Sequence, residues 1–99
     1  MKYTVRISRP ALHQIGEIYE FHREGDPPFA DRWIAGLYEI FATLRTLPNR
    51  GRTAPQSPRR GRTVRQVLYG KYRLSYSVID GRVEITSVRH SALPHVDDE

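Results

Sequence analysis

The sequence predicts a two-layer α+β domain, in which an antiparallel helical hairpin packs on a mainly antiparallel four-stranded sheet. Apolar and polar residues alternate at the N-terminus, apolar residues recur at helical spacing from residue 11 to residue 47, and alternation returns after residue 63. The expected order is therefore strand, helix, helix, strand, strand, strand. A chain of 99 residues has room for one such domain. We assign it to residues 1–93, followed by an acidic flexible tail, residues 94–99.

The first strand is expected over residues 2–8, where alternation is regular. Ser8 is well placed to cap the first helix. Asp26 and Pro27 are a typical cap and first residue of a second helix, which we expect to end at Pro48. A link this short predicts an antiparallel hairpin. The buried stripe of the first helix is expected to comprise Leu12, Ile15 and Tyr19, with Ala11, Ile18 and His22 beside it.

Residues 48–62 (PNRGRTAPQSPRRGR) are predicted to form a long loop, because they combine three prolines, two glycines and five arginines. Two turn signals then separate the last three strands. Gly70-Lys71 predicts a type II′ turn, and Asp80-Gly81 predicts a type I′ turn. A strict two-residue turn at Gly70-Lys71 places Arg65 beside Tyr76 on the helix side of the sheet.

The sheet face away from the helices is expected to be polar. Regular pairing across the second turn sets Ser77 opposite Glu84 and Ser75 opposite Thr86, with Arg73 on the same face. This polar face, beside an arginine-rich loop, could bind phosphate groups or be an ordinary solvated surface.

The sequence alone leaves the register of the last strand open. The apolar residue after Ile85 is Val88, and this odd step predicts a bulge near Thr86-Ser87. Because a one-residue slip exchanges the two faces of a strand, either Arg89 or His90 joins the polar face.

Charge is segregated along the chain. Between Ile40 and Ile79 nine residues are basic and none is acidic, whereas the remainder carries a net charge of −4. This segregation favours a polyanionic partner, which could be nucleic acid, an acidic protein segment or a membrane surface, although loops also collect charge for other reasons. The candidate binding residues are the five arginines of the loop, Arg50, Arg52, Arg59, Arg60 and Arg62.

The inventory of chemical groups is small. The absence of cysteine excludes disulfides, thiolate metal sites and cysteine nucleophiles, and fits a reducing, cytoplasmic location. The four histidines lack metal-ligand spacing, and no glycine-rich phosphate motif is present, so we expect no metal and no cofactor. No apolar run approaches the roughly 18 residues needed to cross a bilayer. An enzyme of this composition would use arginine to stabilise charge and His90 as the best acid or base candidate.

Four stretches together give the chain a family resemblance. They are Tyr3-Thr4-Val5-Arg6-Ile7-Ser8 leading into Ala11; Trp33, Leu37, Leu44 and Leu47-Pro48, followed by Arg52 and Pro55; Val64-Arg65 with Tyr72-Arg73-Leu74-Ser75-Tyr76; and Val83, Ile85, Val88 and His90. In this order, the chain resembles the RelE/ParE toxins of bacterial type II toxin–antitoxin systems over about residues 3–92.

The resemblance implies a growth-inhibiting toxin that is neutralised by a cognate antitoxin in a hetero-oligomeric complex. RelE-like members are metal-independent endoribonucleases that cleave mRNA on the ribosome, and Arg65, Arg73 and His90 could match their catalytic residues. ParE-like members inhibit DNA gyrase and have no known hydrolytic site. The lysine pair of the RelE pattern is not evident, and the Val88-x-His90 ending is closer to the ParE pattern. The resemblance therefore favours gyrase inhibition over mRNA cleavage, with a plain RNA-binding module as a third alternative.

Overall fold

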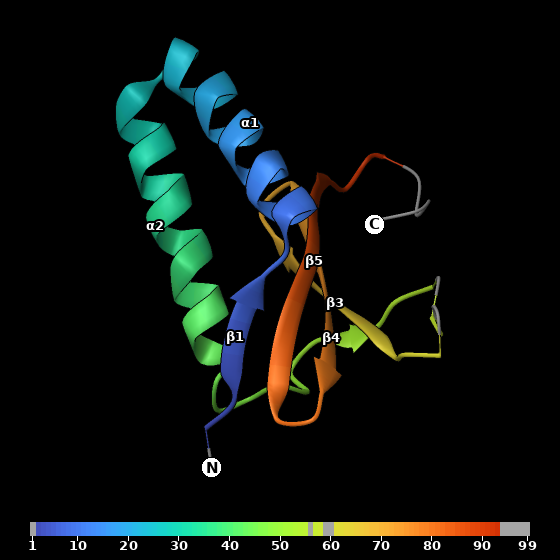
Figure 1. Ribbon diagram of the computed structural model, residues 1–99. Helices are drawn as coiled ribbons and strands as arrows, with labels where there is room; N and C mark the ends of the chain where they lie inside the picture. The colour runs from blue at the N-terminus through green and yellow to red at the C-terminus, as the bar shows by residue number, and fades with distance from the viewer. Residues whose placement is uncertain (1, 56, 59–60, 94–99) are drawn as a thin grey trace.

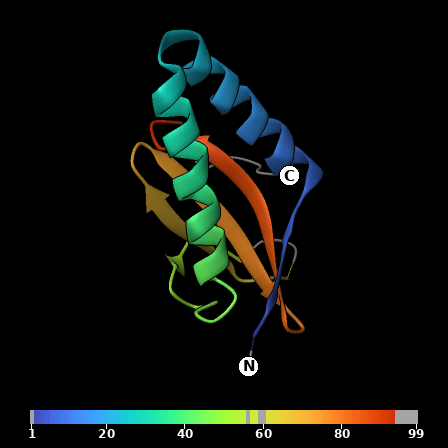
Figure 2. The same ribbon diagram turned by 90° about the vertical axis from the view of Figure 1, so that its left-hand side faces the viewer.

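The computed structural model describes residues 2–55, 57–58 and 61–93, and within them two helices and five strands form one α+β domain (Figure 1). The elements are β1 (Thr4–Ile7), α1 (Arg9–Gly25), α2 (Pro27–Thr43), β2 (Arg52–Thr53), β3 (Val64–Tyr69), β4 (Tyr72–Ile79) and β5 (Arg82–His90). The sheet order is β1-β5-β4-β3-β2, in which β1 runs parallel to β5 and the other pairs are antiparallel. Both helices lie on one face of the sheet (Figures 1 and 2).

The predicted architecture is confirmed, with one strand more than expected. The additional strand is β2, which comes from the predicted loop and pairs with β3. In this pairing Arg52 lies opposite Gln66 and Thr53 lies opposite Arg65. The predicted tail, residues 94–99, lies outside the described residues.

Both helices begin where their capping residues indicate. The Ser8 side chain accepts a hydrogen bond from the backbone N–H of Ala11 at 3.2 Å. The Asp26 carboxylate accepts one from the N–H of Phe29, also at 3.2 Å. Each bond satisfies a donor that the first helical turn leaves free. Helix α2 ends at Thr43, earlier than predicted, and a turn follows it.

The core lies between the hairpin and the sheet. Its buried members are Ala11, Ile15, Trp33, Leu37, Phe41, Leu44, Leu74, Tyr76, Val83, Ile85 and Val88. Leu12 was predicted to belong to the buried stripe, but it is 49% exposed. The stripe of α1 instead begins at Ala11 and continues through Ile15, a spacing of four residues that keeps both side chains on one helix face.

The β4–β5 register contains the predicted bulge. Ser77 pairs with Glu84 as expected, but the predicted pairing of Ser75 with Thr86 is wrong, because Ser75 lies opposite Ser87. Thr86 is the extra residue of β5. The shift keeps Val88 on the helix side of the sheet, in the core.

The bulge also decides which charged residue joins the polar face. Arg89 pairs with Arg73 on the face away from the helices, and His90 pairs with Tyr72 on the helix side. Both predicted turns are present, since Gly70 has φ +57°, and Asp80 and Gly81 both have positive φ.

Candidate functional site

The three candidate catalytic residues do not converge on one point. Arg65 lies opposite Tyr76 and His90 opposite Tyr72, so both are on the helix side but near different ends of β4. Arg73 is on the other face of the same strand. Their role in catalysis stays a prediction.

Arg73 is buried and is engaged by backbone carbonyls. Its side chain is 2% exposed, and its guanidinium donates to the carbonyls of Ser91 and Leu93, each at 3.2 Å. A buried guanidinium needs such acceptors, because an unsatisfied one carries a large desolvation cost. Arg73 therefore holds the segment after β5 against the polar face of the sheet.

Arg65 belongs to a second anchoring cluster at the base of the arginine-rich loop. The Tyr76 hydroxyl accepts a hydrogen bond from the Gly51 N–H at 2.9 Å and donates one to the Pro48 carbonyl at 2.8 Å. Arg65 donates to the Gly51 carbonyl at 2.8 Å. We call Tyr76, Arg65, Gly51 and Pro48 the loop clamp. Burial raises the pKa of the Tyr76 hydroxyl, and its hydrogen bond from Gly51 opposes this shift.

Gly51 is required by this close approach. A Cβ atom at this position would lie 2.7 Å from the Gln66 carbonyl oxygen and 2.7 Å from the Tyr76 hydroxyl. The clamp thus fixes where the loop leaves α2 and where it joins the sheet.

The loop arginines differ in their surroundings. Arg50 donates to the Thr43 hydroxyl at 2.8 Å, and Arg62 forms an exposed ion pair with Glu84 at 3.2 Å. Arg52 is exposed in β2. The remaining two candidates, Arg59 and Arg60, lie outside the described residues.

The strands add further cations to the polar face. Strand alternation and register place arginines from four strands on the side away from the helices, and we call this set the arginine face: Arg6, Arg52, Arg73, Arg82 and Arg89. Arg6 and Arg52 are exposed, whereas Arg82 and Arg89 are half-buried. Period-2 alternation could have assigned Arg6 and Arg82 to this face from the sequence, and only the bulge concealed Arg89.

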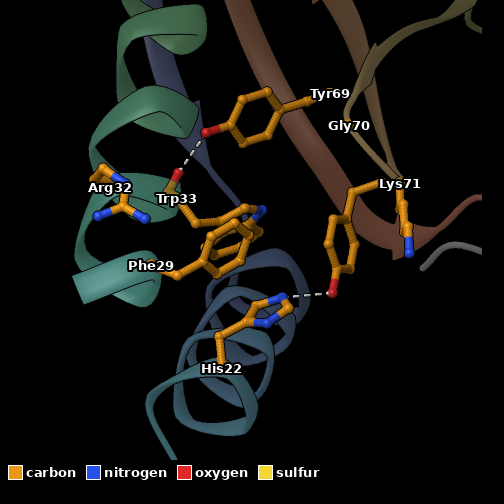
Figure 3. A pocket seen from close by; sticks show the side chains of 8 residues that line it. His22, Phe29, Arg32, Trp33, Tyr69, Gly70 and Lys71 are labelled. Atoms are coloured by element: carbon orange, nitrogen blue, oxygen red, sulfur yellow. Dashed lines mark hydrogen bonds between the residues drawn. The ribbon is translucent and has the colours of Figure 1, made fainter. Parts of the chain in front are cut away.

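An aromatic pocket of about 510 Å³ lies on the helix side, where the hairpin meets the β3–β4 turn (Figure 3). It is lined by His22, Phe29, Arg32, Trp33, Tyr69, Gly70, Lys71 and Tyr72. His22 Nε2 and the Tyr72 hydroxyl share a hydrogen bond of 2.8 Å, and the Tyr69 hydroxyl donates to the Trp33 carbonyl at 2.8 Å. Burial raises the pKa of both tyrosines. The sequence did not indicate this pocket, because its aromatic residues lie in separate elements and Gly70-Lys71 was predicted only as a turn.

Within the described residues, no group of histidine and carboxylate side chains could hold a metal ion. No helix in the same part of the chain is long and apolar enough to span a membrane.

Comparisons with known proteins agree with this architecture. A family model described as the ParE toxin of the type II toxin–antitoxin system parDE matches residues 5–92. A structure of a chromosomal ParDE system from P. aeruginosa has a TM-score of 0.74 and 18% identity, covering 90% of this chain and 96% of that one. The RelBE2 toxin–antitoxin complex from Mycobacterium tuberculosis has a TM-score of 0.60 and 25% identity, covering 91% and 99%. No curated protein matches the sequence.

The fold is thus that of the small toxins of type II toxin–antitoxin systems. Since the family model spans nearly the whole chain, the protein belongs to the ParE toxin family. The predicted resemblance is confirmed, and membership implies a cognate antitoxin as a partner.

Proposed function

We propose that the protein arrests growth by inhibiting DNA gyrase in the cytoplasm and that its cognate antitoxin neutralises it. The observation that carries this choice over mRNA cleavage is the separation of Arg65, Arg73 and His90 over two faces of the sheet. Metal-free cleavage of RNA needs an acid or base and a cation within hydrogen-bond reach of one phosphate.

Hydrogen bonds within the protein occupy the side chains of Arg65, Arg73 and His90, which also supports a binding interface rather than a catalytic centre. Arg65 and Arg73 bind backbone carbonyls within the protein. His90 Nδ1 accepts a hydrogen bond from the Ala92 N–H at 3.0 Å. Each side chain therefore has a structural task that competes with substrate contact.

For gyrase inhibition, we assign the target contact to the arginine face and the adjoining loop. Distributed cations suit a protein–DNA complex, because phosphate contacts position a partner without requiring one reactive centre. Its exposed described members are Arg6, Arg50, Arg52 and Arg62.

One observation favours the alternative, a ribosome-dependent mRNA endoribonuclease. The arginine face gathers several guanidinium groups beside one another, an arrangement that would also bind an RNA backbone. A non-catalytic RNA-binding module would use the same surface.

Metabolic labelling soon after induction without antitoxin tests the choice. An early loss of thymidine incorporation, before methionine incorporation falls, is expected for gyrase inhibition. An early loss of methionine incorporation supports mRNA cleavage instead, and loss of neither supports a binding module.

Substitutions test which residues contact the target. Under our proposal His90→Gln keeps full toxicity, whereas the triple variant Arg50→Gln, Arg52→Gln and Arg62→Gln lowers it at least tenfold. The matched control replaces three exposed arginines elsewhere, Arg9, Arg23 and Arg45, with glutamine and retains toxicity. Equal toxicity of the two triple variants would remove the loop from the target contact, and loss of toxicity with His90→Gln would favour the nuclease.

A further inference from the structure

The aromatic pocket is separate from the arginine face, which carries the proposed target contact. Helix α1 contributes His22, and α2 contributes Phe29 and Trp33. Tyr69 and Tyr72 flank the β3–β4 turn and complete the aromatic lining (Figure 3). The proposed function therefore leaves this pocket without a role.

Two hydrogen bonds between the layers hold the walls of the pocket in place. One joins His22 Nε2 to the Tyr72 hydroxyl, and so links α1 to β4. In the other, the Tyr69 hydroxyl donates to the Trp33 carbonyl, which links β3 to α2. Because these side chains are held before a ligand arrives, binding carries little cost of ordering them. A concave pocket that is formed in advance is typical of a small-molecule site.

The interior of the pocket is aromatic and has the size of a small organic molecule, with a volume of about 510 Å³. The rings pack mainly edge to face. His22 and Phe29 have centroids 4.9 Å apart at an interplanar angle of 72°, and Trp33 and Tyr72 have centroids 5.4 Å apart at 64°. Trp33 is only 5% exposed, so its indole offers no open face on which a nucleobase could stack. The geometry therefore favours a ligand that packs against ring edges over a stacked nucleotide.

The charge at the rim indicates the second property of the ligand. Arg32 and Lys71 line the pocket, and no acidic residue is among the described residues that do so. Figure 3 shows these two side chains on opposite sides of the rings. Their positive potential repels a cationic ligand and attracts an anionic one. Two separated single cations suit one carboxylate better than a chain of phosphates.

A polar group at the wall of the pocket also lacks a partner. Nε1 of Trp33 is buried and has no hydrogen-bond partner among the described residues. Buried donors in proteins are nearly always paired, with protein, water or a ligand. An acceptor atom on a bound ligand would satisfy this donor.

We propose that the aromatic pocket binds a small organic carboxylate with an aromatic body, whose ring packs among the aromatic side chains and whose carboxylate pairs with Arg32 or Lys71. An aromatic body is favoured over an aliphatic one, because rings in edge-to-face contact are stabilised beyond the burial of their area. The proposal does not depend on the target of the toxin, because ligand binding is measured on the isolated protein.

Three probes of similar shape and different charge test the proposal. They are 1-naphthylacetate, its neutral amide 1-naphthylacetamide, and the cationic amine 2-(1-naphthyl)ethylamine. Trp33 is the only tryptophan of the chain, so 5-fluorotryptophan labelling gives one ¹⁹F signal at the pocket. We expect 1-naphthylacetate to shift this signal to saturation with a Kd below about 1 mM, and the amide to bind at least about tenfold more weakly. The amine, and acetate without a ring, should leave the signal unchanged.

Two results of this titration would overturn the proposal. One is the absence of any shift with 1-naphthylacetate at about ten times the expected limiting Kd, and the other is equal affinity for all three naphthyl probes. A signal that responds to an RNA oligonucleotide or to a purified protein partner, but to none of the naphthyl probes, would assign the pocket to a macromolecule and would also overturn it.

A pair of double variants tests the role of the rim cations. The rim variant is Arg32→Gln with Lys71→Gln, and the matched control is Arg45→Gln with Lys2→Gln, which removes one exposed arginine and the only other lysine. Both variants lower the net charge by the same amount. In the rim variant, the affinity for 1-naphthylacetate should fall by at least about tenfold, to that of the amide, whereas the control should stay within about twofold. Equal affinities of the two variants would contradict the assignment of the carboxylate.

A second pair tests whether the ring of the ligand lies inside the pocket. Phe29 lines the pocket, whereas Phe21 is 70% exposed and is not among the described lining residues, although both have an edge contact with His22. Phe29→Ala should weaken both the acetate and the amide by at least about fivefold, and Phe21→Ala should change them by less than about twofold. Circular dichroism checks folding, and Phe29→Leu replaces Phe29→Ala if the latter does not fold. Equal effects at the two positions would place the ligand outside the pocket and overturn the proposal.

Discussion

Two tyrosines on the same face of β4, Tyr72 and Tyr76, lie in different surroundings. Tyr76 belongs to the loop clamp, which we call the structural end of the sheet, and Tyr72 lines the aromatic pocket, which we call the exposed end. Tyr76 is fully buried, and its hydroxyl binds backbone groups of Gly51 and Pro48. Tyr72 is half-buried, and its hydroxyl binds the His22 side chain in an open pocket. Both residues are tyrosines on the same face of one strand, so they differ only in their surroundings and hydrogen-bond partners. Backbone partners in a buried site stabilise the fold, whereas a side-chain partner beside solvent leaves a surface able to accept a ligand.

The largest effect is expected from Gly51→Ala at the structural end. The added methyl group would lie 2.7 Å from the Gln66 carbonyl and the Tyr76 hydroxyl, and neither the sheet backbone nor the clamp can yield cheaply. We expect a loss of at least about 3 kcal/mol of folding free energy. The matched control is Gly16→Ala, which meets no atom within 4 Å in α1 and should stabilise the protein by about 0.5–1 kcal/mol. Urea denaturation measures both; a Gly51→Ala protein as stable as the unmodified one would refute the clamp geometry.

Removing each tyrosine hydroxyl compares the two ends directly. Tyr76→Phe leaves the Gly51 N–H and the Pro48 carbonyl without their partner, and should cost about 2–3 kcal/mol. Tyr72→Phe removes one half-buried hydrogen bond, and should cost about 1 kcal/mol. Thermal denaturation should give melting temperatures in the same order, with a difference of several degrees. Equal losses would mean that the two ends do not differ in the way their contacts indicate.

Alkaline titration should also separate folded from unfolded tyrosines. Burial raises the pKa of Tyr76, and likewise of Tyr72, above the ordinary value of 10.0. Above pH 10 the unfolded chain releases these protons while the native protein retains them. The contribution of these tyrosines to folding stability is therefore fully present below pH 10. It is lost as the pH rises through their pKa values in the folded protein. Urea midpoints measured between pH 8 and 11.5 should fall, and the fall should be shallower for Tyr76→Phe; an unchanged slope in that variant would contradict the assignment.

Local signals made most of the fold predictable. Ser8 and Asp26 cap their helices through hydrogen bonds to residues three positions further along the chain. The Asp80-Gly81 turn joins two strands that are adjacent in the sequence. The odd spacing before Val88 revealed the bulge, although the exact pairing of Ser75 required the register.

The sites depended on contacts between distant residues, which no local pattern encodes. His22 and Tyr72 are 50 residues apart in sequence, so their shared pocket follows only from how the hairpin packs on the sheet. Arg73 was expected on the polar face, and it lies there, but its burial depends on carbonyls of Ser91 and Leu93, after the last strand. Residue type alone therefore indicated a charged surface without distinguishing the arginines that anchor the chain from those that are free to bind.

The smallest effect on stability, and the finest comparison, concerns Arg62 and Arg65, which are three residues apart. Arg62 makes an exposed ion pair with Glu84, so Arg62→Gln should change the folding free energy by less than about 0.5 kcal/mol. Arg65 donates to a backbone carbonyl of the clamp, and Arg65→Gln should cost about 1–2 kcal/mol. Under the proposed target contact, the effects on toxicity should be reversed once both proteins are assayed at equal folded concentration, with Arg62→Gln the weaker toxin. If Arg65→Gln is the weaker toxin at equal folded concentration, Arg65 contacts the target directly, and the clamp end of the sheet is not merely structural.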